Sequence, residues 1–280
     1  MTLESWNAVM PADWHLLRTP PASGAYNMAV DAALLGDAAA RGTGVWRCYD
    51  WALPTISFGR NEAVRTRFDD ASVAAAGFDV VRRPTGGRAL LHMAEVTYSV
   101  TMPLARSRPW QAAYALINEV LLSAVQSLGV DAELVTEHAR VMPPDGPVCF
   151  AAPSLGEIAV HGAKLAGSAV WRDRGAYLQH GSILLADRQT RIRDAARRHA
   201  STPEGTADAD PPLPPAAALG NLLSPPPSWA DVAEALEQAL ARAVTRTPGG
   251  SLRDGPPDVS ALDVARHEVH FRDTTWLWRR

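Results

Sequence analysis

Residues 156–185, GEIAVHGAKLAGSAVWRDRGAYLQHGSILL, decide the fold class of this chain. Apolar and polar residues alternate through three stretches, which are interrupted at His161–Gly162 and at Asp173–Gly175. Alternation with a period of two is typical of half-buried strands, and short glycine-containing interruptions are typical of hairpin turns. The segment therefore predicts three consecutive strands, joined by two hairpins and paired in an antiparallel sheet.

Helical periodicity outside this segment predicts three well-bounded helices. Apolar residues recur at intervals of three and four in each of them, which is the pattern of one buried helix face. The helices cover residues 25–41 after a Ser23 cap and before Gly42, residues 109–129, and residues 229–244 after a Ser228 cap. Serine is favourable in front of a helix because its hydroxyl accepts a backbone N–H of the first turn.

Shorter elements are predicted in the rest of the chain, with strands where β-branched and aromatic residues cluster. The predicted strands are residues 44–51, 55–59, 78–83, 95–102 and 130–135, and the predicted short helices are residues 69–77, 190–200 and 261–269. A strict strand-helix-strand repeat is absent, so the sequence predicts an α+β fold with mixed, largely antiparallel sheets flanked by helices. Residues 1–200 are predicted to form the core, and residues 201–280 a Pro-rich connector with C-terminal helices that pack on the same domain.

Composition and charge exclude several classes of protein. The 280-residue chain is 47% apolar and 20% charged, with a formal net charge of −3, which gives no reason to expect a nucleic-acid or membrane partner. Residues 1–17 lack the apolar core of a secretory signal, and no run approaches the ~18 apolar residues of a membrane helix. The sequence therefore predicts a cytoplasmic protein with free thiols.

Lys164 is the only lysine among the 27 Lys and Arg residues. One explanation is chance, since an Arg-rich composition leaves an occasional surface lysine. The other is chemical: a lysine amine gains or loses a proton when its surroundings shift its pKa, whereas a guanidinium stays charged. Lys164 lies just past the first predicted hairpin turn, and strand ends are where folds commonly present reactive groups.

The two cysteines differ in their sequence context. Cys48 lies inside the predicted strand 44–51, whereas Cys149 follows the turn-rich segment 143–147. A free cysteine usually behaves as a small buried hydrophobe, and it becomes a nucleophile where a polar, accessible environment favours the thiolate. Cys149 is therefore the better candidate for a reactive thiol.

Residues 82–92, RRPTGGRALLH, offer a second group of candidates. Gly86 and Gly87 either let the backbone approach a ligand or simply form a turn, and their spacing is not that of a nucleotide-binding loop. Arg82 and Arg83 either grip an anion or face solvent, and the solvated face is the commoner outcome for an isolated Arg pair.

His92, His180 and Ser168 complete the candidates. Each histidine is either a hydrogen-bonded core residue or a catalytic group. No HxxxH, HxH or DxH pattern accompanies them, so no metal site is expected. Ser168 is a strand hydroxyl that no GxSxG motif surrounds.

Six segments in one order resemble the biotin/lipoate protein ligase and octanoyltransferase family. They are NMAVDAALL, PTISFGRNE, RRPTGGRALLHMAEVTYSV, PVCFAAPSLGEI, GAKLAGSAVWR and LQHGSILL, and they span residues 24–185. The resemblance implies a biotin/lipoyl protein ligase-like (class II synthetase-like) catalytic domain. TGGRALLH followed by EVTYS, with CFAAPS before the lysine, is similar to the cysteine-dependent octanoyltransferase branch, from which Met93, Ala163 and Val170 depart.

The resemblance also implies a reaction. Cys149 would accept an octanoyl group from octanoyl-acyl carrier protein as a thioester, with Lys164 favouring the thiolate. The acyl group would then pass to a lysine of a lipoyl domain, such as that of glycine cleavage H protein or a 2-oxoacid dehydrogenase E2, with no cofactor. The implied substrate-binding residues are Arg83, Gly86, Gly87, His92, Gly167, Ser168 and His180.

Two other hypotheses remain open. In an ATP-dependent lipoate ligase, Lys164 would bind the acyl-adenylate and Cys149 would be incidental; a non-catalytic module would keep the fold and bind lipoyl domains only. The arginines of residues 190–200 either form a docking face for an acidic carrier protein or lie on a solvated helix, and the second is commoner. Those arginines are Arg191, Arg193, Arg197 and Arg198.

Overall fold

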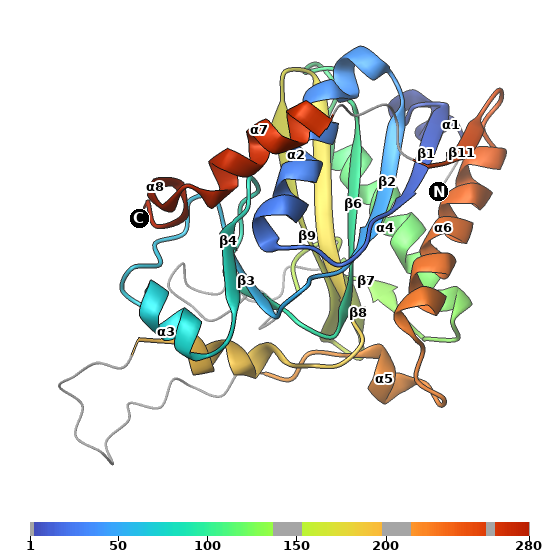
Figure 1. The fold of residues 1–280 in the computed structure, drawn as a ribbon. Coiled ribbons are helices and arrows are strands. Elements are labelled where there is room, and N and C mark those ends of the chain that lie inside the picture. The colour runs from blue at the N-terminus through green and yellow to red at the C-terminus, as the bar shows by residue number, and fades with distance from the viewer. Residues whose placement is uncertain (1–2, 137–152, 198–213, 256–260, 280) are drawn as a thin grey trace.

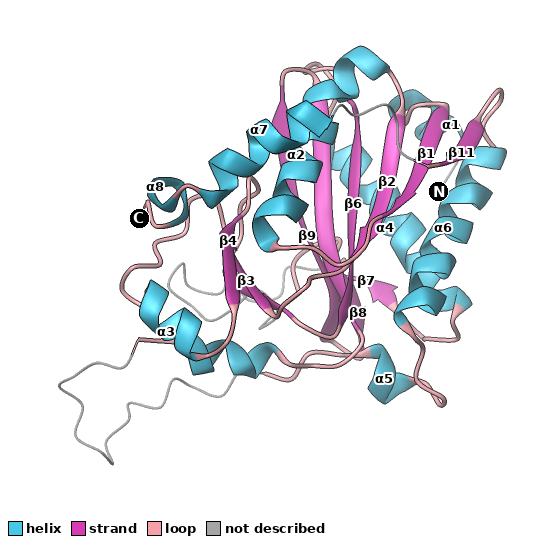
Figure 2. Cartoon of the chain, in the orientation of Figure 1, coloured by secondary structure: helices cyan, strands magenta, loops and turns pink. Residues whose placement is uncertain are grey.

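The computed structural model has a mixed eight-stranded sheet at its centre, with helices on both faces (Figures 1 and 2). It describes residues 3–136, 153–197, 214–255 and 261–279. The strands, in spatial order, are β11 (Ser251–Asp254), β1 (Asp13–Arg18), β2 (Gly44–Tyr49), β6 (Glu95–Pro103), β10 (Ala176–Leu184), β9 (Ala163–Asp173), β8 (Ile158–Val160) and β7 (Glu133–Leu134). β1 is parallel to both of its neighbours and the other pairs are antiparallel, so the predicted fold class is confirmed.

A second, three-stranded sheet lies beside the large one. In spatial order it contains β4 (Asp79–Arg82), β3 (Thr55–Phe58) and β5 (Leu90–His92). The helices are α1 (Leu3–Val9), α2 (Gly24–Arg41), α3 (Asp70–Ala75), α4 (Trp110–Ser127), the 3-10 helix η1 (Gln189–Ala195), α5 (Leu219–Leu222), α6 (Trp229–Thr245), α7 (Ala261–Arg272) and α8 (Thr274–Leu277). No helix in the described part of the chain is long and apolar enough to cross a membrane.

The two faces of the large sheet are covered differently (Figure 1). α4 and α6 pack on one face, where Trp46, Tyr98, Leu121 and Leu236 belong to the largest buried cluster. α2 packs on the other face, between the large sheet and α7, and the small sheet lies on the same side. The pocket described below lies on this second side.

The predicted hairpins are confirmed at both positions. β8 pairs with β9 around His161 and Gly162, whose φ angles are 49° and 78°. β9 pairs with β10 around Arg174 and Gly175, with φ angles of 45° and 87°. Two consecutive residues with positive φ form the tight turn that matches the twist of the flanking strands.

The three long helices are confirmed, and so are the two predicted serine caps. Ser23 accepts the N–H of Tyr26 at the start of α2, and Ser228 forms a reciprocal capping box with Asp231 at the start of α6. The prediction of a helix over residues 190–200 is only partly right, because the described turns form the 3-10 helix η1. β1, β5 and β11 were not predicted, since they are short or lack a clear alternation of apolar and polar residues.

The C-terminal segment contributes to the same body as the rest of the chain. β11 adds an edge strand beside β1, α6 packs on α4, and α7 packs on α2. α8 inserts Leu277 and Trp278 into the cluster around Phe58 of the small sheet. The division of the chain at residue 200 stays a prediction.

A buried ion pair fastens α2 to the large sheet. Asp31 of α2 and Arg47 of β2 have fully buried side chains, and Nη1 of Arg47 lies 2.8 Å from Oδ1 of Asp31. Burial alone would raise the pKa of Asp31, but the hydrogen bond from His180 and the charge of Arg47 hold that pKa below its usual value.

Replacing the buried arginine should destabilise the fold strongly. We expect Arg47→Met to lower the free energy of unfolding by about 3–5 kcal/mol, because the Asp31 carboxylate stays buried without its cation. Arg18→Met, which removes the half-exposed pair with Glu237, should cost at most ~1 kcal/mol. Urea titrations followed by circular dichroism measure both, and equal losses in the two variants would contradict the importance assigned to the buried pair.

Candidate active site

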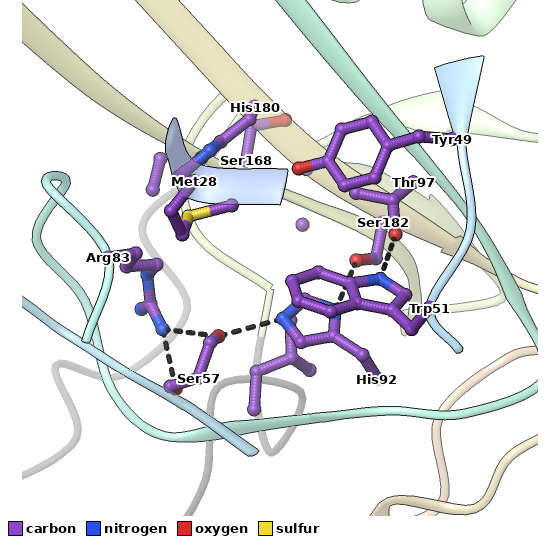
Figure 3. A pocket seen from close by; sticks show the side chains of 14 residues that line it. Met28, Tyr49, Trp51, Ser57, Arg83, His92, Thr97, Ser168, His180 and Ser182 are labelled. Carbon is purple, nitrogen blue, oxygen red and sulfur yellow. Dashed lines mark hydrogen bonds between the residues drawn. The ribbon is translucent and has the colours of Figure 1, made fainter. Parts of the chain in front are cut away.

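A cavity of about 30 Å³ lies between α2, the small sheet and the β9–β10 hairpin (Figure 3). Its wall is mostly apolar in area but carries several hydroxyls and imidazoles. The lining residues are Met28, Tyr49, Trp51, Ser57, Arg83, Leu90, His92, Thr97, Gly167, Ser168, Ala169, His180, Gly181 and Ser182. Segments separated by more than 150 residues in the sequence therefore meet at one cavity.

Most of the predicted substrate-binding residues line this cavity. Arg83, His92, Gly167, Ser168 and His180 are in the wall. Two others, Gly86 and Gly87, lie in the adjoining loop and are not lining residues. Of the predicted catalytic pair, Lys164 lies on β9 close to the cavity, and Cys149 lies outside the described residues.

Arg83 shapes the glycine loop rather than facing solvent. Its guanidinium donates to the carbonyls of Ser57, Gly86 and Arg88 at 2.8 to 3.1 Å. Gly87 has a φ of 94°, and its carbonyl oxygen would lie 1.8 Å from a Cβ at Gly59, so the two backbones touch. This contact requires glycine at position 59.

The preference for a solvated Arg82–Arg83 pair was wrong. Both side chains are buried, and Arg82 donates to the carbonyls of Gly59, Glu62 and Leu277. The main-chain carbonyls of a tight loop and of the C-terminal helix α8 need donors, and the multiple N–H groups of guanidinium supply them. Two adjacent arginines after a strand can therefore organise a loop from within.

His92 belongs to a buried chain of hydrogen bonds. Its Nδ1 lies 2.6 Å from Oε1 of Glu95, and its Nε2 lies 2.7 Å from the hydroxyl of Ser57. The ring of Trp51 stacks on the imidazole with 3.9 Å between centroids, and its indole N–H donates to Thr97 (Figure 3). When Nδ1–H donates to Glu95, Nε2 can accept a hydrogen bond from the Ser57 hydroxyl.

His180 is held in a similar way from α2. Its Nδ1 lies 3.2 Å from Oδ2 of Asp31, and its Nε2 lies 2.6 Å from the hydroxyl of Thr85. Burial lowers the pKa of His180 in spite of the hydrogen bond to Asp31. The neutral ring fits both contacts, because Nδ1–H donates to Asp31 while Nε2 accepts from Thr85.

Gly167 of β9 and Gly181 of β10 line the cavity at a point where the two strands pack closely. A Cβ at Gly181 would lie 2.2 Å from the carbonyl oxygen of Gly167 and 2.9 Å from the ring of Tyr98. Ser168, directly opposite Gly181, forms a 2.6 Å hydrogen bond with the Tyr98 hydroxyl. Glycine is therefore required at position 181, because the backbone of β9 and the Tyr98 ring already occupy the space beside it.

Lys164 is buried and paired with a carboxylate that the sequence analysis did not single out. Its Nζ lies 2.8 Å from Oε2 of Glu157, and both side chains are at least 95% buried. Oε2 also accepts the N–H of Ser154 at 2.7 Å, and Oε1 lies 3.4 Å from the backbone N of Ser168. One carboxylate therefore links the lysine to the cavity wall, which rules out the chance explanation of a surface lysine.

The sequence analysis also missed other polar residues of the site. Asp31, Ser57 and Glu95 are buried and bind its histidines directly. Glu95 follows His92 by three positions, which was a usable signal. Asp31 and Ser57 have no local pattern that separates them from other polar residues of a helix and a strand.

The prediction that Cys48 lies inside a strand is confirmed. It lies inside β2 with no exposed area, and burial raises the pKa of its thiol to about 12. A thiol with that pKa is almost entirely protonated at neutral pH and is a poor nucleophile.

Comparison with known proteins identifies the family. The model for the lipoyl protein ligase A/B catalytic domain matches residues 23–241. The octanoyltransferase LipM of Kyrpidia tusciae is 37% identical over 290 residues, which cover 95% of this chain and 99% of that protein. The chain belongs to the lipoyl protein ligase A/B family. LipM of Staphylococcus aureus is 39% identical over 185 residues, covering 62% of this chain and 67% of that protein, and the predicted octanoyltransferase branch is confirmed.

Solved structures agree on the fold of this family member. Lipoate-protein ligase A bound with ATP superposes with a TM-score of 0.71 at 16% identity, over 95% of this chain and 98% of that one. A bi-partite lipoate protein ligase from Thermoplasma acidophilum, described with its E2 lipoyl domain, gives 0.68 at 17% identity over 96% of both chains. The predicted lipoyl protein ligase-like fold is therefore confirmed.

The buried His180 should make the fold acid-sensitive. Because its folded pKa is lowered, protonation favours the unfolded state, and stability is lost as the pH falls below about 6.5, the unfolded value. We expect the free energy of unfolding to fall less between pH 7 and 5 in His180→Gln than in the unsubstituted protein. Urea titrations across this range test the difference, and parallel pH profiles would contradict it. The range stays above about pH 4, where loss of the Asp31 contribution sets in.

Proposed function

We propose that this chain transfers an octanoyl group from octanoyl-acyl carrier protein to a lysine of a lipoyl domain, through a thioester on Cys149. The observation that carries the proposal is the buried ion pair of Lys164 with Glu157. The Glu157 carboxylate also lies near the backbone N of Ser168, a residue of the cavity wall. The family supports it, because relatives at 37–43% identity are named octanoyltransferase.

The cavity fits the acyl part of this substrate. Met28, Trp51 and Leu90 supply apolar surface to the wall of the cavity. The polar side chains of the wall already bind protein partners, so an alkyl chain meets carbon rather than unsatisfied polar groups. At about 30 Å³ the cavity holds roughly one water, so the acyl chain would enter with movement of flexible side chains such as Met28.

The first half of the reaction would form the acyl-enzyme. The ammonium of Lys164 favours the thiolate of Cys149, which attacks the thioester carbonyl of the donor. Collapse of the tetrahedral intermediate breaks the bond to the carrier thiol, and the leaving thiolate takes a proton from Lys164. Cys149 then carries the octanoyl group and Lys164 is a neutral amine.

The second half would return the proton. The neutral ε-amine of the acceptor attacks the acyl carbon, its proton passes to Lys164, and the Cys149 thiolate leaves as the amide forms. Each cycle consumes one thioester and one amine and produces one amide and one thiol. An amide is more stable than a thioester, so the route needs no nucleotide.

Lipoyl domains are the acceptors we infer. The structural neighbour from T. acidophilum is described together with an E2 lipoyl domain, and the family is defined by its lipoyl ligases. Glycine cleavage H protein or a 2-oxoacid dehydrogenase E2 would present the required lysine. Of the proposed carrier-docking arginines, Arg191 and Arg197 form ion pairs with Asp194 and Asp69, which reduces their free charge.

Intact-mass analysis tests the covalent step. Incubation with octanoyl-acyl carrier protein and no nucleotide should add one octanoyl group, removable by hydroxylamine, and Cys149→Ala should abolish it while Cys48→Ala keeps it. An adduct that persists in Cys149→Ala would refute the nucleophile. A strict requirement for ATP would favour the lipoate ligase, and lipoyl-domain binding without transfer would favour a non-catalytic module.

Exchange of the lysine for arginine tests the proton transfer. Lys164→Arg keeps a positive charge but cannot give up a proton, so we expect the rate of transfer to fall by about 10²–10⁴-fold. Single-turnover assays with a lipoyl-domain acceptor measure it. Transfer at the unsubstituted rate would show that Lys164 acts by charge alone.

A further inference from the structure

We propose that Glu157 is the positioning residue of this site, which holds the Lys164 ammonium and fixes the turn that follows the Cys149 segment. The inference deepens the proposed function and rests on it. Glu157 contributes one carboxylate to three groups: Nζ of Lys164, the N–H of Ser154 and the backbone N of Ser168. Those groups belong to the lysine strand, the chain that leads to the nucleophile, and the cavity wall.

Hydrogen bonds between its own residues stabilise the turn at residues 154–157. Ser154 donates its N–H to the Glu157 carboxylate at 2.7 Å, and Glu157 returns its own N–H to the Ser154 carbonyl at 3.0 Å. Between them Gly156 has a φ of 80°, and a Cβ there would lie 3.0 Å from the ring of Tyr114. Glu157 thus closes a turn whose shape depends on its side chain as well as its backbone.

Neighbouring elements hold the same turn from outside. Asn118 of α4 donates to the carbonyl of Gly156 at 2.7 Å and accepts from Gln179 of β10 at 2.8 Å. Gln179 also donates to the Tyr98 hydroxyl, which binds Ser168. The turn and the cavity wall therefore share one buried hydrogen-bond network, so a shift of one is felt by the other.

The short stretch of chain between Ser154 and Cys149 connects the position of this turn to the reaction. Five peptide units separate Cys149 from Ser154, and an extended chain spans at most about 3.6 Å for each of them, or roughly 18 Å. Ser154 is anchored on the very oxygen that pairs with Lys164. Glu157 therefore fixes the Lys164 ammonium and the start of the chain that leads back to Cys149, and misplacement of a reacting group by about 1 Å is enough to slow a reaction 10²-fold.

The Glu157 carboxylate also affects the protonation of Lys164 during the proposed reaction cycle. Lys164 becomes neutral after the first proposed step, and an adjacent carboxylate favours its return to the ammonium form. Tyr98 of β6, Tyr114 of α4 and Tyr177 of β10, which donates to Gln179, are other titratable groups that the described elements bring to this network. Burial raises the pKa of Tyr98, so its phenol stays neutral through the working range.

The single lysine permits a direct measurement. Protein labelled with ¹³Cε-lysine should give one lysine side-chain signal, whose pH titration reports the protonation of Lys164. We expect Glu157→Gln to lower the titration midpoint of Lys164 by about 1–3 pH units, because it removes an opposite charge at hydrogen-bond distance. Glu237→Gln, which removes the carboxylate of the half-exposed pair between α6 and Arg18 of β1, should leave the midpoint unchanged.

Two variants separate charge from position. In steady-state assays of octanoyl transfer, Glu157→Gln should lower kcat by about 10²-fold with little change in KM for the donor. Glu157→Asp keeps the charge but shortens the side chain by one methylene, so the midpoint should stay near that of the unsubstituted protein while kcat still falls. Thermal unfolding identifies a variant that has lost its fold, and Glu157→Asp then supplies the kinetic test.

The outcomes distinguish this inference from the proposed function. Unchanged kcat in both Glu157 variants would overturn the positioning role, and an unchanged midpoint in folded Glu157→Gln would overturn the control of Lys164. If the unsubstituted protein forms no octanoyl adduct on Cys149, the proposed function fails, and the positioning role in transfer falls with it. The titration still decides whether Glu157 governs the lysine.

Discussion

The burial of one carboxylate, that of Asp31, constrains the position of α2 and of the cavity beneath it. Asp31 accepts from Arg47 and Ser99 through Oδ1 and from Tyr49 and His180 through Oδ2, so one side chain of α2 binds three strands of the large sheet. A fully buried charge is costly unless every lone pair is used, and the four donors therefore have to stay in place together. Because His180 is one of them, the constraint that seats the helix also orients a wall of the cavity.

The local features of the sequence predict the elements and not their long-range partners. The hairpins of residues 156–185 and the capped helices could be predicted because turn residues, caps and periodicity act within a few positions. β1 and β11 pair across 238 residues from Asp13 to Ser251, and nothing local to either segment specifies that partner. The ordered set of motifs located the cavity wall by resemblance. Glu157, beside the recognised lysine in space, looked like an ordinary polar residue at a strand start.

The groups that fix the shape of the cavity are different from the groups to which the proposed chemistry is assigned. The small sheet and the β9–β10 hairpin build a wall whose arginine, histidines and hydroxyls are bound to protein partners, so these groups fix the shape of the cavity. Lys164 lies beyond the wall, on the far side of the Glu157 carboxylate from Ser168. In the proposed function, such a division would let the cavity accept an alkyl chain without placing unsatisfied polar groups against it, while the ionic pair would lie near the carbonyl end.

The same fold occurs in a lipoate-protein ligase A whose structure has ATP bound, so the fold by itself does not choose the reaction. The choice has to lie in a few groups beside the acyl cavity. A buried lysine paired with one carboxylate is suited to a thioester route, because that route needs one cation near a thiol and one proton that leaves and returns. Ligation through an adenylate has to neutralise several phosphate charges, for which one ammonium already bound to a carboxylate is poorly matched. Among the described residues, the Lys164–Glu157 pair therefore suits the proposed acyl transfer.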